Sequence, residues 1–181
     1  GAGVPRHHST PAAHAGLRRL GTDHIDLVQV HEWDGQTPLE ETLSALDSLV
    51  QSGKVRYIGA SNYAAWHLMK ALGTSERTGV SRFTSQQIYY SLQARDAETE
   101  LVPVSIDQGL GILVWSPLAG GVLSGKYRRG MDAPAGSRHL RQCDEPPVDD
   151  DDKLYARIAV LIENDDAHGG YAVKIALASR A

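Results

Sequence analysis

Four short, mostly apolar segments of this 181-residue chain end at nearly regular intervals in a polar or amphipathic side chain. The ends are His31, Ser61, Gln87 and Trp115, and successive ends lie 26 to 30 residues apart. A strand with its crossover helix and two loops takes about 30 residues. The spacing therefore predicts a parallel α/β sheet. Its polar strand ends should gather at the carboxyl edge, where ligands bind in α/β barrels.

The length limits how much of a barrel this chain can build. A complete (β/α)₈ barrel takes about 250 residues, whereas 181 residues are enough for one substantial core. We therefore expect a single α/β domain over residues 1–181, with about four parallel strands and flanking helices. The segment 127–152 is rich in proline and acidic residues and is predicted to be a long loop within that domain.

Composition excludes several classes of partner and location. The net charge of −4 gives no general attraction to nucleic acid or to an anionic membrane. No apolar run approaches the roughly 20 residues that a membrane span needs. The only cysteine, Cys143, excludes an intrachain disulfide and is typical of a reducing compartment. We expect a cytoplasmic protein that binds neither nucleic acid nor membrane.

Helix signals lie between the strand segments. Thr37 is expected to cap a helix that starts with Pro38 and forms a capping box with Glu40. Glycine is expected to end three of the helices. The predicted helices cover 38–50 before Gly53, 64–72 before Gly73, 101–108 before Gly109, and then 154–162 and 172–178.

The first two strand ends offer candidate site residues, each with an ordinary structural alternative. His31 could bind a ligand, or it could bond to backbone or be shielded by Trp33. Asn62 follows Ser61 and has two donors and an acceptor, which suit an amide ligand, but it could also cap the next helix. A metal site with His31, Glu32 and Asp34 is a remote alternative, because adjacent strand residues point to opposite faces.

The last two strand ends lead to the same kind of choice. Gln87 matches an amide ligand or bonds to neighbouring backbone, and Trp115 is a flat stacking surface or a core residue. Segment 116–126 is rich in glycine and ends in Lys126, which suits close approach of backbone to an anion. It is not a Walker loop, because Tyr127 follows Lys126.

Three long motifs in this order resemble the aldo-keto reductases, in particular their bacterial branch and the related potassium-channel β subunits. The motifs are LGTDHIDLVQVH at 20–31, GKVRYIGASN at 53–62 and WSPLAGG at 115–121. The resemblance implies a (β/α)₈ barrel that binds NADPH at the carboxyl face of its strands. It further implies hydride transfer to a small aldehyde or ketone, with a tyrosine as the proton donor.

The resemblance assigns roles by position. His31 matches the histidine that binds and orients the substrate carbonyl, and is the expected catalytic residue. Ser61, Asn62 and Gln87 match the residues that hold the nicotinamide carboxamide. The expected contacts along the rest of the cofactor, from the stacking ring to the phosphates, are Trp115, Ser116, Leu118, Lys126 and Arg138.

The family's catalytic aspartate, tyrosine and lysine find no match in these 181 residues. The resemblance places the start of the chain just past the third barrel strand and leaves the last strand without a match. We therefore expect an incomplete segment with little reductase activity by itself, because positioned acid catalysis contributes about 10²–10⁴-fold. The alternative is a non-catalytic domain that binds a nicotinamide cofactor or regulates a partner.

An incomplete barrel has open strand edges. The strands near Ile25 and Ile112 are expected to lie at those edges, and apolar edges favour association. We expect the chain to self-associate through them.

Overall fold

The computed structural model describes residues 6–127, 130, 134–137, 152–168 and 172–178. Contacts within the chain group these residues into two compact units. The first unit comprises Gly1–Ile88 and Glu98–Leu113, and the second comprises Tyr89–Ala97 and Val114–Ala181.

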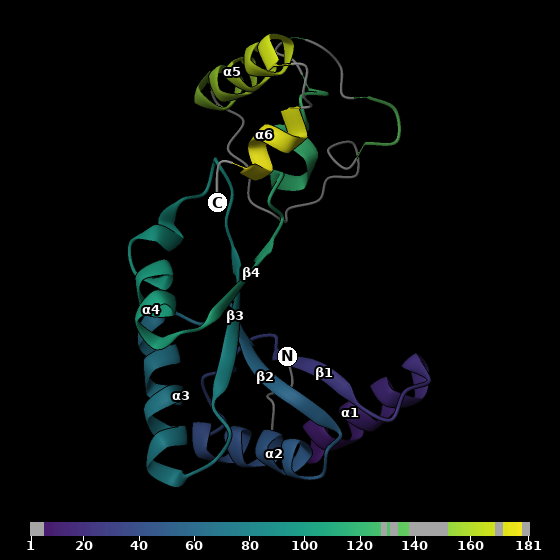
Figure 1. Ribbon diagram of the computed structural model, residues 1–181, viewed down its shortest axis with the longest axis vertical. Coiled ribbons are helices and arrows are strands. Elements are labelled where there is room, and N and C mark those ends of the chain that lie inside the picture. Colours follow the sequence, from purple (N-terminus) through teal and green to yellow (C-terminus); the bar gives the residue numbers. More distant parts are fainter. Residues whose placement is uncertain (1–5, 128–129, 131–133, 138–151, 169–171, 179–181) are drawn as a thin grey trace. The chain divides into compact units, whose positions relative to one another are not determined.

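Four parallel strands form one sheet, as the spacing predicts (Figure 1). Their order in the sheet follows their order in the chain, which is the α/β pattern of a partial (β/α)₈ barrel. The strands are β1 (Ile25–Val30), β2 (Val55–Ser61), β3 (Phe83–Tyr89) and β4 (Gly111–Trp115).

Helices α2 to α4 follow one another along one face of this sheet (Figure 1). The helices of the first unit are α1 (Arg6–Leu20), α2 (Leu39–Gln51), α3 (Ala65–Thr78) and α4 (Leu101–Gln108), and a short 3₁₀ turn, η1 (Asp96–Glu98), precedes α4. Each crossover returns the chain to the amino end of the next strand, so successive strand ends share one edge.

The main core lies between the strands and these helices. Leu43 of α2, Leu68 of α3 and Phe83 of β3 are completely buried, and Ile58 of β2 is 1% exposed. Burying such side chains stabilises each position by about 1.5–3 kcal/mol. The apolar stripe of α2 recurs every three or four residues, and this spacing turns one helix face onto the sheet.

The second unit has its own small core. The 3₁₀ turns η2 (Ala119–Ser124) pack with α5 (Asp152–His168) and α6 (Ala172–Ala178). Leu123, Leu154, Ile158 and Ala176 are the buried side chains at their contact. The predicted helix 154–162 is therefore part of a longer helix.

Two expected helix signals are wrong. Thr37 does not cap α2, because its hydroxyl donates to Asp34 and Pro38 stands at the N-cap position without a side-chain bond. Gly73 does not end its helix, since α3 continues to Thr78 and stops at Gly79, whose φ is +69°. The helix continues through Gly73 because its neighbours Leu72, Thr74 and Ser75 are buried, and their packing stabilises this part of α3.

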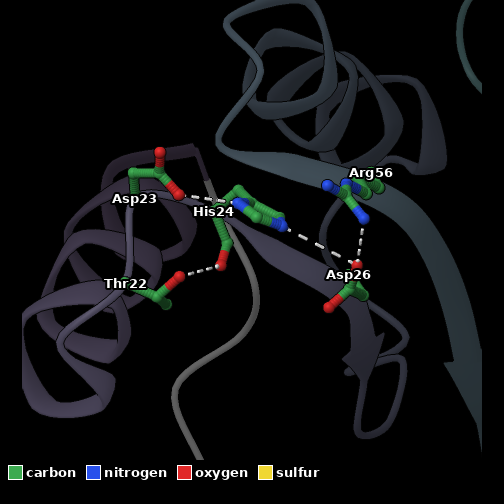
Figure 2. A network of polar contacts seen from close by, with 5 residues as sticks. All are labelled: Thr22, Asp23, His24, Asp26 and Arg56. Atoms are coloured by element: carbon green, nitrogen blue, oxygen red, sulfur yellow. Dashed lines mark hydrogen bonds and ion pairs between the residues drawn. The ribbon is translucent and has the colours of Figure 1, made fainter.

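A polar network ties β1 to β2 at their amino ends (Figure 2). Arg56 donates to Asp26 over 2.8 Å, and the His24 ring lies 2.7 Å from Asp23. Both members of the Arg56–Asp26 pair are more than half exposed. Such exposed pairs contribute about 0.2–1 kcal/mol, so the network adds little to stability.

None of the helices that the structure describes is both long and apolar enough to cross a membrane.

Candidate functional site

The carboxyl edge of the sheet carries the first group of predicted site residues. Ser61 is the last residue of β2, Gln87 lies near the end of β3, and His31 directly follows β1. The register pairs Ser61 with Gln87, and it pairs Val30, the residue before His31, with Ala60. His31, Ser61 and Gln87 therefore occupy neighbouring positions in one row across three strands.

Asn62 joins this row by hydrogen bonds. Its side-chain amide donates to the carbonyl oxygen of His31 over 3.3 Å, and its backbone N–H donates to the carbonyl of Gln87 over 3.0 Å. Asn62 thus bridges the segments that follow β1 and β2 to the end of β3. The structure brings together the four residues predicted from this unit.

The backbone of Asn62 is held in the left-handed region, with φ of +56°. Among the described residues, the other non-glycine positions with positive φ are Ser116 and Ala119, both in the glycine-rich segment after β4. This conformation is unfavourable for L-residues and concentrates at binding and catalytic loops. Its positions here fall in the segments predicted to hold the cofactor.

Ser61 is 1% exposed, and within the described part of the chain nothing forms a hydrogen bond with its hydroxyl. A buried hydroxyl without a partner costs about 1–3 kcal/mol. A ligand with a carboxamide could accept from it, while the Asn62 and Gln87 side chains offer both donor and acceptor atoms. The donor set therefore fits a nicotinamide.

Asp34 has a structural role. Its carboxylate accepts from the backbone N–H groups of Gln36 and Thr37 and from the Thr37 hydroxyl, all within 3.0 Å. These bonds, led by the Thr37 backbone N–H, lower the pKa of Asp34 and close the turn after His31. In the described residues, no group of three or more His, Cys, Asp or Glu could hold a metal ion.

Tyr63 is buried beside Asn62 and packs edge-on against Phe83, with ring centroids 5.8 Å apart. Burial first, and the nearby Asp34 charge second, raise the pKa of Tyr63 to about 12. A proton donor in catalysis works best with a pKa near the operating pH. Tyr63 is therefore poorly suited to that role.

The predicted stacking ring, the indole of Trp115, lies in the second unit. Trp115, at the end of β4, stacks on Tyr89 at the end of β3, with centroids 4.6 Å apart and planes 23° apart. This stack sets the orientation of the indole.

The glycine-rich segment turns tightly after Trp115. Ser116 accepts from the Ala119 backbone N–H over 2.9 Å, and Leu118 accepts from those of Gly121 and Leu123. The Lys126 ammonium lies over Gly121, where an added Cβ would stand 3.3 Å from Nζ. Glycine backbone beside a lysine ammonium can approach an anion closely and bind it.

Arg138 lies outside the described residues. The predicted cofactor residues therefore stand in two groups: the row with Asn62 in the first unit, and the segment after β4 in the second unit.

Sequence reasoning missed a second polar row one step deeper in the sheet. Gln29, Gly59 and Ser85 are paired across β1, β2 and β3, and Gln29 donates to Ser85 over 3.3 Å. The available signal was a glutamine among the apolar residues Leu27, Val28 and Val30 that precede His31.

The fold agrees with the comparison with known proteins. The model of the aldo/keto reductase family matches residues 2–168. The chain belongs to the aldo/keto reductase family. Members of this family use nicotinamide cofactors and act as oxidoreductases on small molecules.

Individual relatives align with this aldo-keto reductase chain over most of its length. It is 46% identical over 128 residues to the uncharacterized oxidoreductase YrpG of Bacillus subtilis, covering 71% of this chain and 38% of YrpG. It is 43% identical over 122 residues to versiconal hemiacetal acetate reductase of Aspergillus parasiticus, covering 67% and 35%. A protein of Arabidopsis thaliana named probable voltage-gated potassium channel subunit beta is 36% identical over 137 residues, covering 75% and 42%.

The aligned part is less than half the length of each of these relatives.

Proposed function

We propose that this chain supplies the nicotinamide-binding and carbonyl-orienting part of an NADPH-dependent reductase of aldehydes and ketones. The observation that supports this most strongly is Asn62, which links the His31 segment to Gln87 beside the buried hydroxyl of Ser61. The family match and the oxidoreductases among the relatives agree with it.

The residues of the first unit bind the nicotinamide and orient the substrate. Ser61, Asn62 and Gln87 hold the carboxamide of the nicotinamide, which fixes the face of the ring turned to the substrate. His31 donates a hydrogen bond to the carbonyl oxygen of the substrate, and this orients the carbonyl carbon and stabilises the negative charge that develops on the oxygen. NADPH, when bound, supplies the hydride.

The residues after β4 bind the rest of the cofactor. Trp115 stacks on the nicotinamide ring, and Ser116 and Leu118 contact the pyrophosphate through the turn that they form. Lys126 offsets the phosphate charge from its place over Gly121. Arg138 is a basic contact further along the cofactor.

These 181 residues contain no match to the family's catalytic aspartate, tyrosine and lysine, so we expect little turnover from them alone. Loss of a positioned proton donor lowers the rate by about 10²–10⁴-fold. The test follows NADPH oxidation with a reactive aldehyde and measures NADPH affinity by fluorescence titration. Binding with negligible oxidation is expected. Robust turnover that His31→Ala abolishes would show that the proton donor is not missing.

A second candidate function is cofactor sensing without catalysis. It is favoured by the 36% identity to a protein named as a potassium-channel β subunit. The titration tests a requirement that the two functions share. Micromolar NADPH affinity without turnover agrees with both functions, and no NADPH binding contradicts both. Robust NADPH oxidation would contradict the sensor.

A further inference from the structure

The row beneath the candidate site is polar, although it lies in the middle of three strands. Gln29 of β1, Gly59 of β2 and Ser85 of β3 are register partners, and we call them the floor row. Side chains alternate between faces along a strand. The floor row therefore shares a face with His31, Ser61 and Gln87, each two residues further along its strand.

The amide of Gln29 crosses over Gly59 to reach Ser85. Its Nε2 donates to the Ser85 hydroxyl over 3.3 Å. A Cβ added to Gly59 would stand 2.9 Å from Gln29 Cδ, and still closer to Gln29 Oε1 and the Ser85 hydroxyl. A Cβ at position 59 would therefore displace the Gln29 amide, because that amide occupies the space of a side chain.

One atom of this amide has no partner among the residues that the structure describes. Gln29 Oε1 is buried, and no described residue hydrogen-bonds to it. Exchanging the amide O and N would pair the oxygen with the Ser85 hydroxyl and leave the nitrogen unpaired instead. In either orientation the unpaired atom costs about 1–3 kcal/mol, and buried polar atoms without a hydrogen-bond partner are rare in folded proteins.

The Ser61 hydroxyl is a second buried polar group that lacks a hydrogen-bond partner within the described ranges. Ser61 lies two residues after Gly59 on β2. Two strand residues span about 6.6 Å, and two hydrogen bonds of about 2.9 Å reach across most of that distance. A small group with both donor and acceptor atoms would satisfy both side chains. A carboxamide is such a group.

We propose that Gln29 is a further cofactor-binding residue, whose side-chain amide holds the nicotinamide carboxamide together with the Ser61 hydroxyl. This inference rests on the proposed NADPH binding. It extends the binding surface one row deeper than the residues assigned by the family resemblance, and gives Gly59 and Ser85 the role of keeping the Gln29 amide in place.

The test compares wild type with Gln29→Met, which keeps the length of the side chain and removes both polar atoms. NADPH affinity is measured by fluorescence titration, and stability by thermal melting. We expect affinity to fall about fivefold to tenfold, the value of one hydrogen bond. We also expect an unchanged or raised Tm, because removing an unsatisfied amide from the core relieves a cost.

If the floor row has only a structural role, the opposite result is expected. Gln29→Met would then lower Tm through loss of the bond to Ser85 and leave NADPH affinity unchanged, and that result would overturn the inference. Failure of Gln29→Met to fold would overturn it too, because the proposal requires the change to be tolerated. Ser85→Ala is expected to weaken NADPH binding by a smaller factor, since the Gln29 amide remains but loses its anchor.

Two controls separate this inference from the proposed function. Gln51→Met, on the exposed end of α2, should leave affinity unchanged. An NADPH analogue with an acetyl group in place of the carboxamide lacks the N–H group that Gln29 Oε1 would accept, so it should bind wild type and Gln29→Met equally. If Gln29→Met instead loses the same factor of affinity for NADPH and for the analogue, the carboxamide contact is contradicted. Wild type that binds no NADPH overturns both proposals. Wild type and Gln29→Met that bind NADPH equally overturn only this one.

Discussion

At the scale of single residues, Asn62 combines an unfavourable backbone conformation with one side-chain and one backbone hydrogen bond to neighbouring strand ends. Its φ of +56° costs an ordinary L-residue about 1–2 kcal/mol, and asparagine tolerates it better than most. Its two bonds to the His31 and Gln87 segments compensate for that cost. Strain and binding geometry therefore coincide at one position.

A pair of variants separates the two contributions of Asn62. Asn62→Ala should lower stability by about 1 kcal/mol or more, because alanine is strained at positive φ and the side-chain bond is lost. Asn62→Gly should retain more of the stability, since glycine adopts this φ freely. Both should lose most NADPH affinity. Denaturant melts with cofactor titrations measure this, and full NADPH binding by Asn62→Gly would remove Asn62 from the site.

At the scale of elements, the two glycines of the α3 region have opposite roles. Gly73 lies inside the helix on its exposed side, and a Cβ there would meet nothing within 4 Å. Gly79 ends the helix in the left-handed conformation, and its N–H donates to Ser75 over 2.9 Å. Gly73 is thus a conformational liability, whereas Gly79 is a helix stop.

Substitution with alanine should therefore change stability in opposite directions at these glycines. Gly73→Ala is expected to stabilise the protein by about 0.5–1 kcal/mol, since it restores helix propensity. Gly79→Ala is expected to destabilise it by about 1 kcal/mol, since alanine is strained there. Thermal melts of the two variants check this, and a lower Tm for Gly73→Ala would contradict it.

Asp47 of α2 holds the loop between α3 and β3 through Ser81. Its carboxylate accepts from the Ser81 backbone N–H over 2.9 Å and from the Ser81 hydroxyl over 2.7 Å. These bonds, the backbone one first, lower the pKa of Asp47 below its usual 3.8. The resulting stability is present above pH 3.8 and disappears as the pH falls through the lowered pKa of the folded state.

Asp47→Asn should therefore cost about 1–2 kcal/mol at neutral pH and progressively less below pH 3.8. Urea unfolding of wild type and variant across pH 2–7 measures the difference. Asp107→Asn, on the exposed face of α4, is the matched control and should show little effect. A deficit for Asp47→Asn that does not depend on pH would rule out this account.

At the scale of the molecule, helices cover one face of the sheet, while no described residue covers part of its other face or pairs with the outer edge of β1. Leu27 and Tyr57 are register partners on that other face, and Tyr57 is 58% exposed. Leu113 of β4 is 38% exposed. Exposed apolar residues beside an open strand edge favour pairing between chains.

We expect the chain to self-associate through this edge. Sedimentation at increasing protein concentration should show dimers or larger species, and Leu27→Lys should reduce them, because a charge beside an open strand opposes pairing. Met69→Lys, on an exposed face of α3, is the control. A single monomer species at every concentration would contradict the prediction.

The pattern of elements could be predicted because it depends on local chemistry. Apolar runs at intervals of about 30 residues, the α2 stripe and the glycine after α4 each act within a few residues, and the strands and helices formed where these signals placed them. The signals that misled were also local. The Thr37 cap lost to a bond with Asp34, and packing beside Gly73 outweighed its low helix propensity.

The amino-acid sequence by itself determined the strand order and the row of side chains at the carboxyl edge, because side-chain alternation and right-handed crossovers leave few other arrangements. Only the tertiary structure decided how Asn62 bridges two neighbouring strands, and that the Gln29 amide lies over Gly59 with one atom unpaired within the described part of the chain. Such contacts join residues about 25 to 56 positions apart. Their geometry is set by strand register and close packing, which no local pattern encodes.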